Sequence, residues 1–212
     1  MSDQVILLHG LWMRGFALLM LHRRMMEAGF RVHRFDYMSV ATTQERILGR
    51  LQARMHELAE DGHTVHLVGH SLGGLVIYRF LERYPHQPPG RVVFLGTPSV
   101  ASRAAVQAAH IRLVASAMGR SVQDELLRPR DRRWKAVDRE LGIIAGTRPL
   151  GFGQILAKFE EDCDGTIGVS ETQLPGATDH ITLHVSHLGM LVSSRVARET
   201  GAFLQEGRFS LR

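Results

Sequence analysis

Cysteine, lysine and long apolar runs are all scarce in this chain of 212 residues. A single cysteine, Cys163, excludes an intramolecular disulfide and fits a reducing compartment. No apolar run approaches the ~18 residues that cross a bilayer, which excludes a membrane-spanning helix. Lysine occurs only at Lys135 and Lys158, so arginine supplies nearly all of the basic charge.

The N-terminus also lacks the basic flank, apolar stretch and small-residue cleavage site of a secretory leader. Polar residues at positions 2–4 lead directly into an apolar run at 5–8. Because a single cysteine without a leader fits the cytoplasm, we expect a cytoplasmic protein. The sequence shows no repeat, low-complexity segment or linker, so we expect a single domain over residues 1–212.

Short apolar runs alternate with longer segments of helical spacing along the chain. The apolar runs predict strands, several of them buried on both faces, at residues 5–8, 31–37, 65–68, 92–95, 142–145 and 181–185. Helices are predicted at residues 14–28, 43–60, 71–84, 104–118 and 188–204. This alternation predicts a doubly wound α/β fold, with a mostly parallel sheet of about six strands flanked by helices.

The formal net charge of +5 is concentrated in one segment. Residues 100–139 contain nine basic and four acidic residues, whereas the two kinds balance in the rest of the chain. This excess of arginine predicts attraction to an anionic substrate or a membrane surface. The alternative is a core helix at 104–118 followed by a solvated basic loop.

The strongest motif is Gly69-His70-Ser71-Leu72-Gly73, a Gly-x-Ser-x-Gly sequence between a predicted buried strand and a predicted apolar helix. In this context a sharp, strained turn lifts the serine Oγ clear of the sheet, and the flanking glycines avoid side-chain collisions. We therefore predict that Ser71 is a nucleophile. A tight turn with an ordinary serine is the alternative.

Two backbone N–H groups are expected to face the negative charge that develops on a substrate attacked by Ser71. One belongs to Leu72, at the start of the following helix, where N–H groups stabilise anions. The other belongs to Leu11, because a His-Gly pair follows the first strand and its glycine lets that loop approach the serine. Trp12 is expected to form a wall of the substrate pocket. A simple turn is the alternative for this loop.

A general base is sought among twelve histidines. Doubly wound sheets bind ligands beyond the carboxyl ends of their strands. His180, His184 and His187 lie in or after the last predicted strand, and His187 is the one in the loop that follows it. We therefore predict His187 as the base. His70 adjoins the serine but is expected to point away from it.

A carboxylate between the serine and the histidine in the chain should orient the imidazole. Asp164 is the first candidate, because Gly165 follows it and allows a tight turn. Asp179 is the second candidate.

Taken in chain order, these motifs resemble those of the α/β-hydrolase superfamily, in particular small bacterial esterases and lipases. The matching segments are residues 9–10, 69–74, 93–98, 164–167 and 186–187. The resemblance implies a triad of Ser71, His187 and Asp164 that cleaves carboxylic esters through an acyl-enzyme, without a cofactor or a metal ion. Secreted lipases normally carry a leader and often a calcium site, and neither is evident here. The resemblance also implies a cap over the pocket at residues 100–139, where the helix at 104–118 would line the acyl pocket. The chain is short, so any lid is expected to be small or absent.

Other functions stay open at this stage. A thioesterase or an acyltransferase would use the same three residues. A non-catalytic basic protein that binds nucleic acid or anionic surfaces is a different class, but only Trp134 interrupts the arginine-rich segment as a stacking residue. A metal site built from His180, His184 and His187 is a weaker alternative. We expect a small-molecule ester, including a lipid, as the partner and no nucleic acid, and a weak association with anionic membranes stays open.

Overall fold

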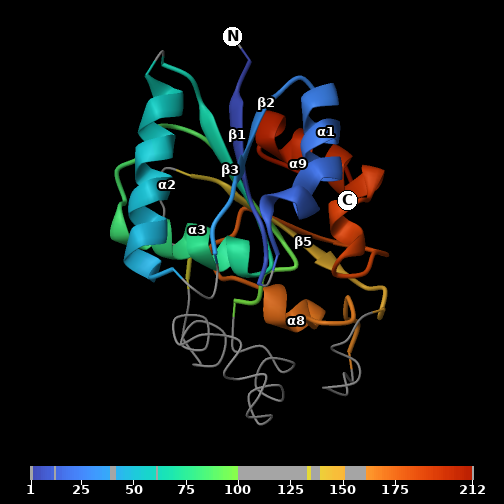
Figure 1. The fold of residues 1–212 in the computed structure, drawn as a ribbon. Helices are drawn as coiled ribbons and strands as arrows, with labels where there is room; N and C mark the ends of the chain where they lie inside the picture. The colour runs from blue at the N-terminus through green and yellow to red at the C-terminus, as the bar shows by residue number, and fades with distance from the viewer. Residues whose placement is uncertain are drawn as a thin grey trace.

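The computed structural model describes residues 2–11, 13–38, 42–60, 62–99, 133–134, 139–150 and 161–211, which build one sheet with helices on both faces (Figure 1). Every strand pair in the sheet is parallel, and the strand order is β2-β1-β3-β4-β5-β6. The strands are β1 (Gln4–Leu8), β2 (Arg31–Phe35), β3 (Val65–His70), β4 (Val92–Leu95), β5 (Leu141–Gly146) and β6 (Asp179–Leu183). This arrangement confirms the predicted doubly wound α/β sheet.

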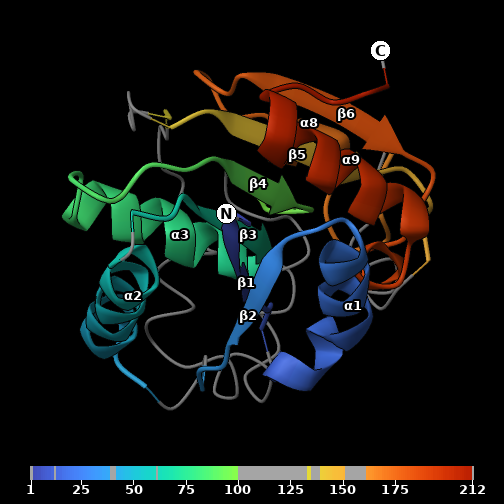
Figure 2. The same ribbon diagram turned by 90° about the horizontal axis from the view of Figure 1, so that it is seen from above.

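The helices form two layers, one on each face of the sheet (Figure 2). On one face lie α2 (Gln44–Ala59) and α3 (Leu72–Arg83), and on the other lie α1 (Leu19–Glu27) and α9 (Ser194–Glu206). Three short helices complete the described part: η1 (Gly15–Leu18), α8 (Val169–Thr172) and η2 (Gly189–Leu191). Within the described ranges, no helix combines the length and the apolar character needed to cross a membrane.

Alternation of side chains along the strands divides the core into two halves. Ile6 and Leu67 belong to the half packed by α2 and α3, whereas Val5, Leu7 and Val68 belong to the half packed by α1 and α9. All of these side chains are essentially inaccessible to solvent. Because both faces of the central strands are covered, their sequences are almost continuously apolar.

Most predicted elements recur with shifts of a few residues, but the closing helix is broken. We predicted one helix over residues 188–204, whereas the structure has η2 and then a new start at α9. Ser193 is the cause, because its extended backbone and its hydroxyl, which accepts the Val196 N–H at 3.3 Å, form a helix N-cap.

The predicted cap at residues 100–139 lies outside the described residues except for positions 133, 134 and 139. Trp134 packs its ring against Tyr78 and Phe94, at centroid distances of 6.5 and 5.9 Å. Arg139 is buried, and its guanidinium donates to the carbonyls of Val65 and Pro88. Burial lowers the pKa of Arg139 to about 10. At least this one arginine of the basic segment is therefore structural rather than exposed to a substrate.

Because all six strands are parallel, their carboxyl ends meet at one edge of the sheet. The loops that leave β1, β3 and β4 at this edge begin with His9, Ser71 and Gly96. The loop after β6 carries His187 to the same edge. The fold therefore collects at one place segments that are far apart in the sequence.

We predict that Gly49→Ala stabilises the protein, because Gly49 lies inside α2 and an added Cβ would meet nothing within 4 Å. Alanine is favoured over glycine in a helix interior by about 1 kcal/mol. Thermal unfolding should show a midpoint raised by about 2–4 °C. The matched control is Gly29→Ala, which has equally open space but a φ of +95° and should lower the midpoint. Equal shifts in the two variants would contradict this account.

Candidate active site

Ser71 is the one residue that connects the end of β3 to the start of α3. Its backbone has φ 54° and ψ −121°, and it is the one residue other than glycine with a positive φ in the described part of the chain. The Ser71 N–H donates to the Leu95 carbonyl at 2.9 Å, and the Thr97 hydroxyl donates to the Ser71 carbonyl at 3.0 Å. Two well-anchored elements and these hydrogen bonds hold the serine in a strained conformation.

The glycines around Ser71 are required by close backbone contacts. A Cβ added to Gly69 would collide with the backbone of Gly74, and one added to Gly73 would collide with the carbonyl oxygen of Leu8. A Cβ on Gly74 would strike the side chain of Thr97. The turn can therefore pass tightly over β1 and β4 only with glycine at these positions.

Asp164 and His187 form a buried pair. Asp164 Oδ2 lies 2.6 Å from His187 Nδ1, and the His187 N–H donates to the Asp164 carbonyl at 2.9 Å. The other carboxylate oxygen, Oδ1, accepts the N–H groups of Thr166 at 2.8 Å and Ile167 at 2.7 Å. Only 1% of Asp164 and 7% of His187 are exposed. The carboxylate thus fixes the imidazole with Nδ1 as a donor and leaves Nε2 free to accept a proton.

Gly96, which sequence reasoning did not select, completes the surroundings of this pair. Its φ is +55°, and an added Cβ would lie 2.9 Å from Asp164 Oδ2 and 3.1 Å from His187 Nδ1. Only glycine therefore leaves room for the Asp164–His187 hydrogen bond at the end of β4. The available sequence signal was the glycine that directly follows an apolar strand in Leu95-Gly96-Thr97.

His70 also contacts the pair, in a way that the sequence did not reveal. Its side chain points toward the loop of His187: Nε2 donates to the His187 carbonyl at 2.9 Å, and the two rings lie 4.6 Å apart. Burial lowers the pKa of His70 to about 3, with a smaller effect in the same direction from His187, so the ring is neutral. His70 is therefore not a free base beside the serine.

The loop after β1 approaches the serine as predicted. A Cβ on Gly10 would lie 3.2 Å from both Ser71 Cβ and His70 Nδ1. His9 anchors this loop: its ring stacks on Tyr37 at 4.3 Å, and the Tyr37 hydroxyl donates to the His9 carbonyl at 2.6 Å. Glycine at position 10 lets the backbone come this close to the nucleophile turn.

The N–H groups of Leu11 and Leu72 have no hydrogen-bond acceptor among the described residues. Leu72 begins the twelve-residue helix α3, where the first N–H groups have no partner within the helix and the dipole favours negative charge. Within this part of the chain, neither group is therefore occupied by a protein acceptor. Trp12, which was expected to line the pocket, lies outside the described residues.

Among the described residues, the Ser71 hydroxyl and the His187 ring make no hydrogen bond to each other. Such contacts between a nucleophile and its base are often long without substrate and shorten when it binds. The two residues are nonetheless connected, since Ser71 directly follows His70, which bonds to the His187 carbonyl.

The alternative candidates are placed elsewhere. His180 bonds to the Thr172 hydroxyl at 2.9 Å, and Asp179 accepts the Phe209 N–H at 3.0 Å, both near the amino end of β6. His184 lies one residue beyond β6 and is exposed. Across the described ranges, no group of three potential ligands among His, Cys, Asp and Glu is arranged to hold a metal ion.

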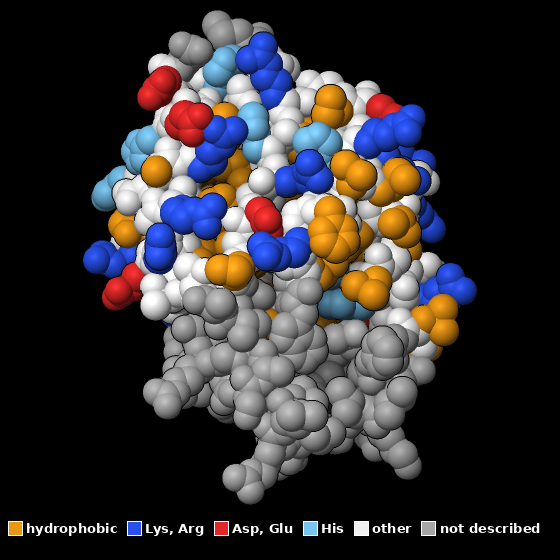
Figure 3. Space-filling model, viewed as in Figure 1, with side chains coloured by type: hydrophobic (Ala, Val, Ile, Leu, Met, Phe, Trp, Pro, Cys, Tyr) orange, Lys and Arg blue, Asp and Glu red, His pale blue; other side chains and the backbone are white. Residues whose placement is uncertain are grey.

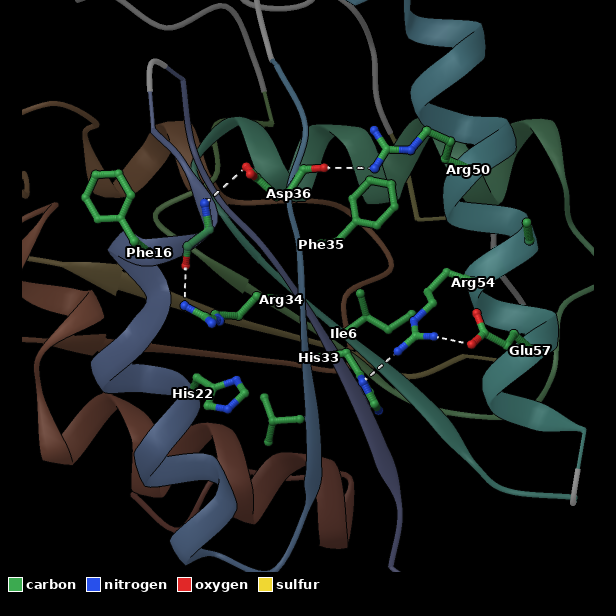
Figure 4. Close-up of a pocket in the computed structure, with 13 residues that line it drawn as sticks. Ile6, Phe16, His22, His33, Arg34, Phe35, Asp36, Arg50, Arg54 and Glu57 are labelled. Atoms are coloured by element: carbon green, nitrogen blue, oxygen red, sulfur yellow. Dashed lines mark hydrogen bonds and ion pairs between the residues drawn. The ribbon is translucent and has the colours of Figure 1, made fainter.

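An open groove of about 750 Å³ lies along β2, at one edge of the sheet (Figure 4). It runs along β2 between α1 and α2, with Arg34 and His22 on one side of the strand and Arg50 and Arg54 on the other. Arg54 pairs with Glu57 and bonds to His33, and Arg50 stacks on Phe35. None of the residues discussed above as the candidate site lines this groove.

Comparison with solved structures finds the same fold in several hydrolases. The mature lipase BlEst2 of Bacillus licheniformis is 21% identical, with a TM-score of 0.72, 98% of this chain covered and 93% of that chain. Phospholipase PlaB of Legionella pneumophila is 16% identical, with a TM-score of 0.71, 94% of this chain covered and 56% of that chain. A pyrethroid hydrolase of Sphingobium faniae is 15% identical, with a TM-score of 0.65, 97% of this chain covered and 98% of that chain. At these identities the likeness shows a shared fold.

Comparison with curated proteins gives no match. The sequence profile of the alpha/beta hydrolase family matches residues 5–193, which span nearly all of the strands and the edge where their loops converge. With this match and the all-parallel doubly wound sheet, the chain belongs to the alpha/beta hydrolase family.

Proposed function

We propose that the protein is a serine hydrolase that cleaves carboxylic esters, with Ser71 as nucleophile, His187 as general base and Asp164 as its orienting carboxylate. The observation that carries the proposal is the buried Asp164–His187 hydrogen bond of 2.6 Å at the edge where Ser71 occupies a strained turn. These three residue types, in this chain order, form the set used for nucleophilic acyl transfer in α/β-hydrolases.

The proposed reaction begins with proton transfer from the Ser71 hydroxyl to His187 Nε2. Nε2 can accept this proton because Nδ1 already carries one, which it donates to Asp164. As the proton leaves, the serine oxygen bonds to the ester carbonyl carbon. The imidazolium then gives its proton to the departing alcohol as the C–O bond breaks, which leaves an acyl-serine. Water, activated in the same way, releases the acid and restores the serine.

The N–H groups of Leu11 and Leu72, which have no acceptor among the described residues, are the proposed donors to the oxyanion formed in each step. Fixed donors aimed at the developing charge commonly contribute about 3 kcal/mol each to transition-state stabilisation. Anchoring of the first loop by His9 and Tyr37 supports this role for Leu11, because a donor that is already in place needs no reorganisation.

The character of the surface around the site supports an ester with an apolar part. Leu188, which directly follows His187, is 62% exposed. Figure 3 shows hydrophobic side chains gathered on the α1 side of the molecule. The neighbours of known fold named above are a lipase, a phospholipase and a pyrethroid hydrolase. We therefore propose an apolar ester, which includes a lipid, as the substrate class.

Ser71→Ala should abolish labelling by a fluorophosphonate probe, because the probe bonds to an activated serine oxygen. Hydrolysis of a short p-nitrophenyl ester should fall by about 10⁴-fold or more. Ser193→Ala, at a helix cap, is a matched serine control that should keep both activities. Undiminished hydrolysis by folded Ser71→Ala would refute the proposal, and faster turnover of a matched thioester by the parent would indicate a thioesterase instead.

Asp164→Asn should lower kcat by about 10⁴-fold with a small change in KM, because an amide cannot hold the imidazole in the required tautomer. The matched control is Asp179→Asn, the second candidate from the sequence, which should keep kcat near that of the parent. The steady-state kinetics of both variants decide between the two carboxylates, and a larger loss in Asp179→Asn would reverse the assignment.

Gly96→Ala should lower kcat by about 100-fold, because the new methyl group would push Asp164 and His187 from their positions by a fraction of an ångström or more. Gly29→Ala has comparable backbone strain but open surroundings, so it should retain activity despite reduced stability. Parent-like kcat in a folded Gly96→Ala protein would mean that the site tolerates crowding at this point.

A further inference from the structure

We propose that His70 is a positioning residue that holds the backbone of His187 in place, so that the serine turn and the base are locked together by one side chain. This inference rests on the proposed function of Ser71 and His187. It adds a role for the residue that precedes the nucleophile, which the proton-transfer scheme above does not use.

The contacts of His187 show what His70 adds. The imidazole of His187 is held by Asp164 Oδ2, and its N–H is held by the Asp164 carbonyl. Both of these contacts come from the same residue. The carbonyl of His187 is held by His70 Nε2 at 2.9 Å, from a different strand. His70 therefore supplies the hydrogen bond that ties the base loop to β3 rather than to the Asp164 loop.

The rings of the two histidines also pack together. They lie 4.6 Å apart with an interplanar angle of 47°, and His70 is 1% exposed. A displacement of the His187 ring toward His70 would therefore be opposed by a side chain that is itself fully buried. Packing and hydrogen bonding act in the same direction at this point.

The chemistry of His70 favours a dedicated role over simple filling of the core. Nε2 carries the proton, because it faces a carbonyl oxygen, which leaves a lone pair on Nδ1. That Nδ1 is buried and has no hydrogen-bond partner among the described residues, although it lies next to Gly10. An apolar side chain would avoid the unpaired nitrogen. An apolar side chain could not, however, donate the hydrogen bond to the His187 carbonyl that His70 makes.

The positioning role of His70 also depends on its being uncharged. The titratable groups around it are His187, whose ring it contacts, His9 in the loop after β1, and Asp164 across the His187 ring. Burial keeps the pKa of His70 near 3, so His70 stays uncharged when His187 accepts the serine proton. The positive charge of the intermediate is then confined to the imidazole that faces Asp164.

The decisive comparison is between His70→Leu and His70→Gln. Leucine fills similar space but cannot donate, whereas the glutamine Nε2 can reach the place of the histidine Nε2 and donate to the same carbonyl. We expect kcat for a p-nitrophenyl ester to fall by about 30- to 100-fold in His70→Leu with KM nearly unchanged, because small displacements of a base are costly. His70→Gln should restore kcat to within about threefold of the parent.

A second measurement separates positioning from a general loss of structure. The short Asp164–His187 hydrogen bond should give the parent a strongly downfield proton signal in NMR, which should broaden or shift in His70→Leu and return in His70→Gln. The matched control is His66→Leu, a buried histidine at the other end of β3 that bonds to the Arg91 N–H. It should leave both kcat and the signal unchanged.

These outcomes also distinguish the inference from the proposed function. If the parent neither reacts with a fluorophosphonate nor hydrolyses esters, the proposed function fails, and the NMR comparison still tests whether His70 holds the pair. If the parent is active, an unchanged kcat and an unchanged signal in folded His70→Leu overturn the inference. Equal losses in the leucine and glutamine variants overturn it as well, because the hydrogen bond would then not be the cause.

Discussion

The positive φ of Ser71 is the constraint on which the rest of the site depends. This conformation is unfavourable for a residue with a side chain, so it persists only because the elements on both sides are fixed by burial. β3 is covered on both faces, and most of α3 is buried against the sheet. The glycines around Ser71 leave room for this turn, and the Thr97 hydroxyl holds the Ser71 carbonyl in place. The positions of the Gly10 loop and the His187 loop are then set by contact with the turn.

Much of the fold could be predicted from the sequence, because a parallel sheet buried on both faces leaves continuous apolar runs that are easy to detect. The break before α9 could not, because apolar spacing continues through it and the decisive feature is the single cap at Ser193. The prediction for Arg139 was wrong for a different reason. Counting charges assigned it to an exposed basic segment, whereas the structure buries its guanidinium among backbone carbonyls. Composition carries no information about hydrogen-bond partners.

Some residues of the candidate site could be predicted from the sequence and others could not. Ser71 could be selected from a local motif, and Asp164 and His187 from chain order and their places after strands; the structure brings the latter two together as a hydrogen-bonded pair. Gly96 and His70 could not be selected, because their importance lies in contacts between segments far apart in the chain. A glycine after a strand and a histidine before a serine are common. Only the packing of β3, β4 and the last loop shows what each one does.

The edge of the sheet formed by β2 has a consequence for how copies of the protein meet. β2 has no strand beyond it in the described structure, and an uncovered row of N–H and C=O groups is a template for pairing with another chain. This strand is short, and it carries exposed Arg31 and Arg34. Two such edges brought together would place like charges within a few ångströms of one another. The arginines along β2 therefore act against fusion of sheets from neighbouring molecules, and so against aggregation in a crowded solution.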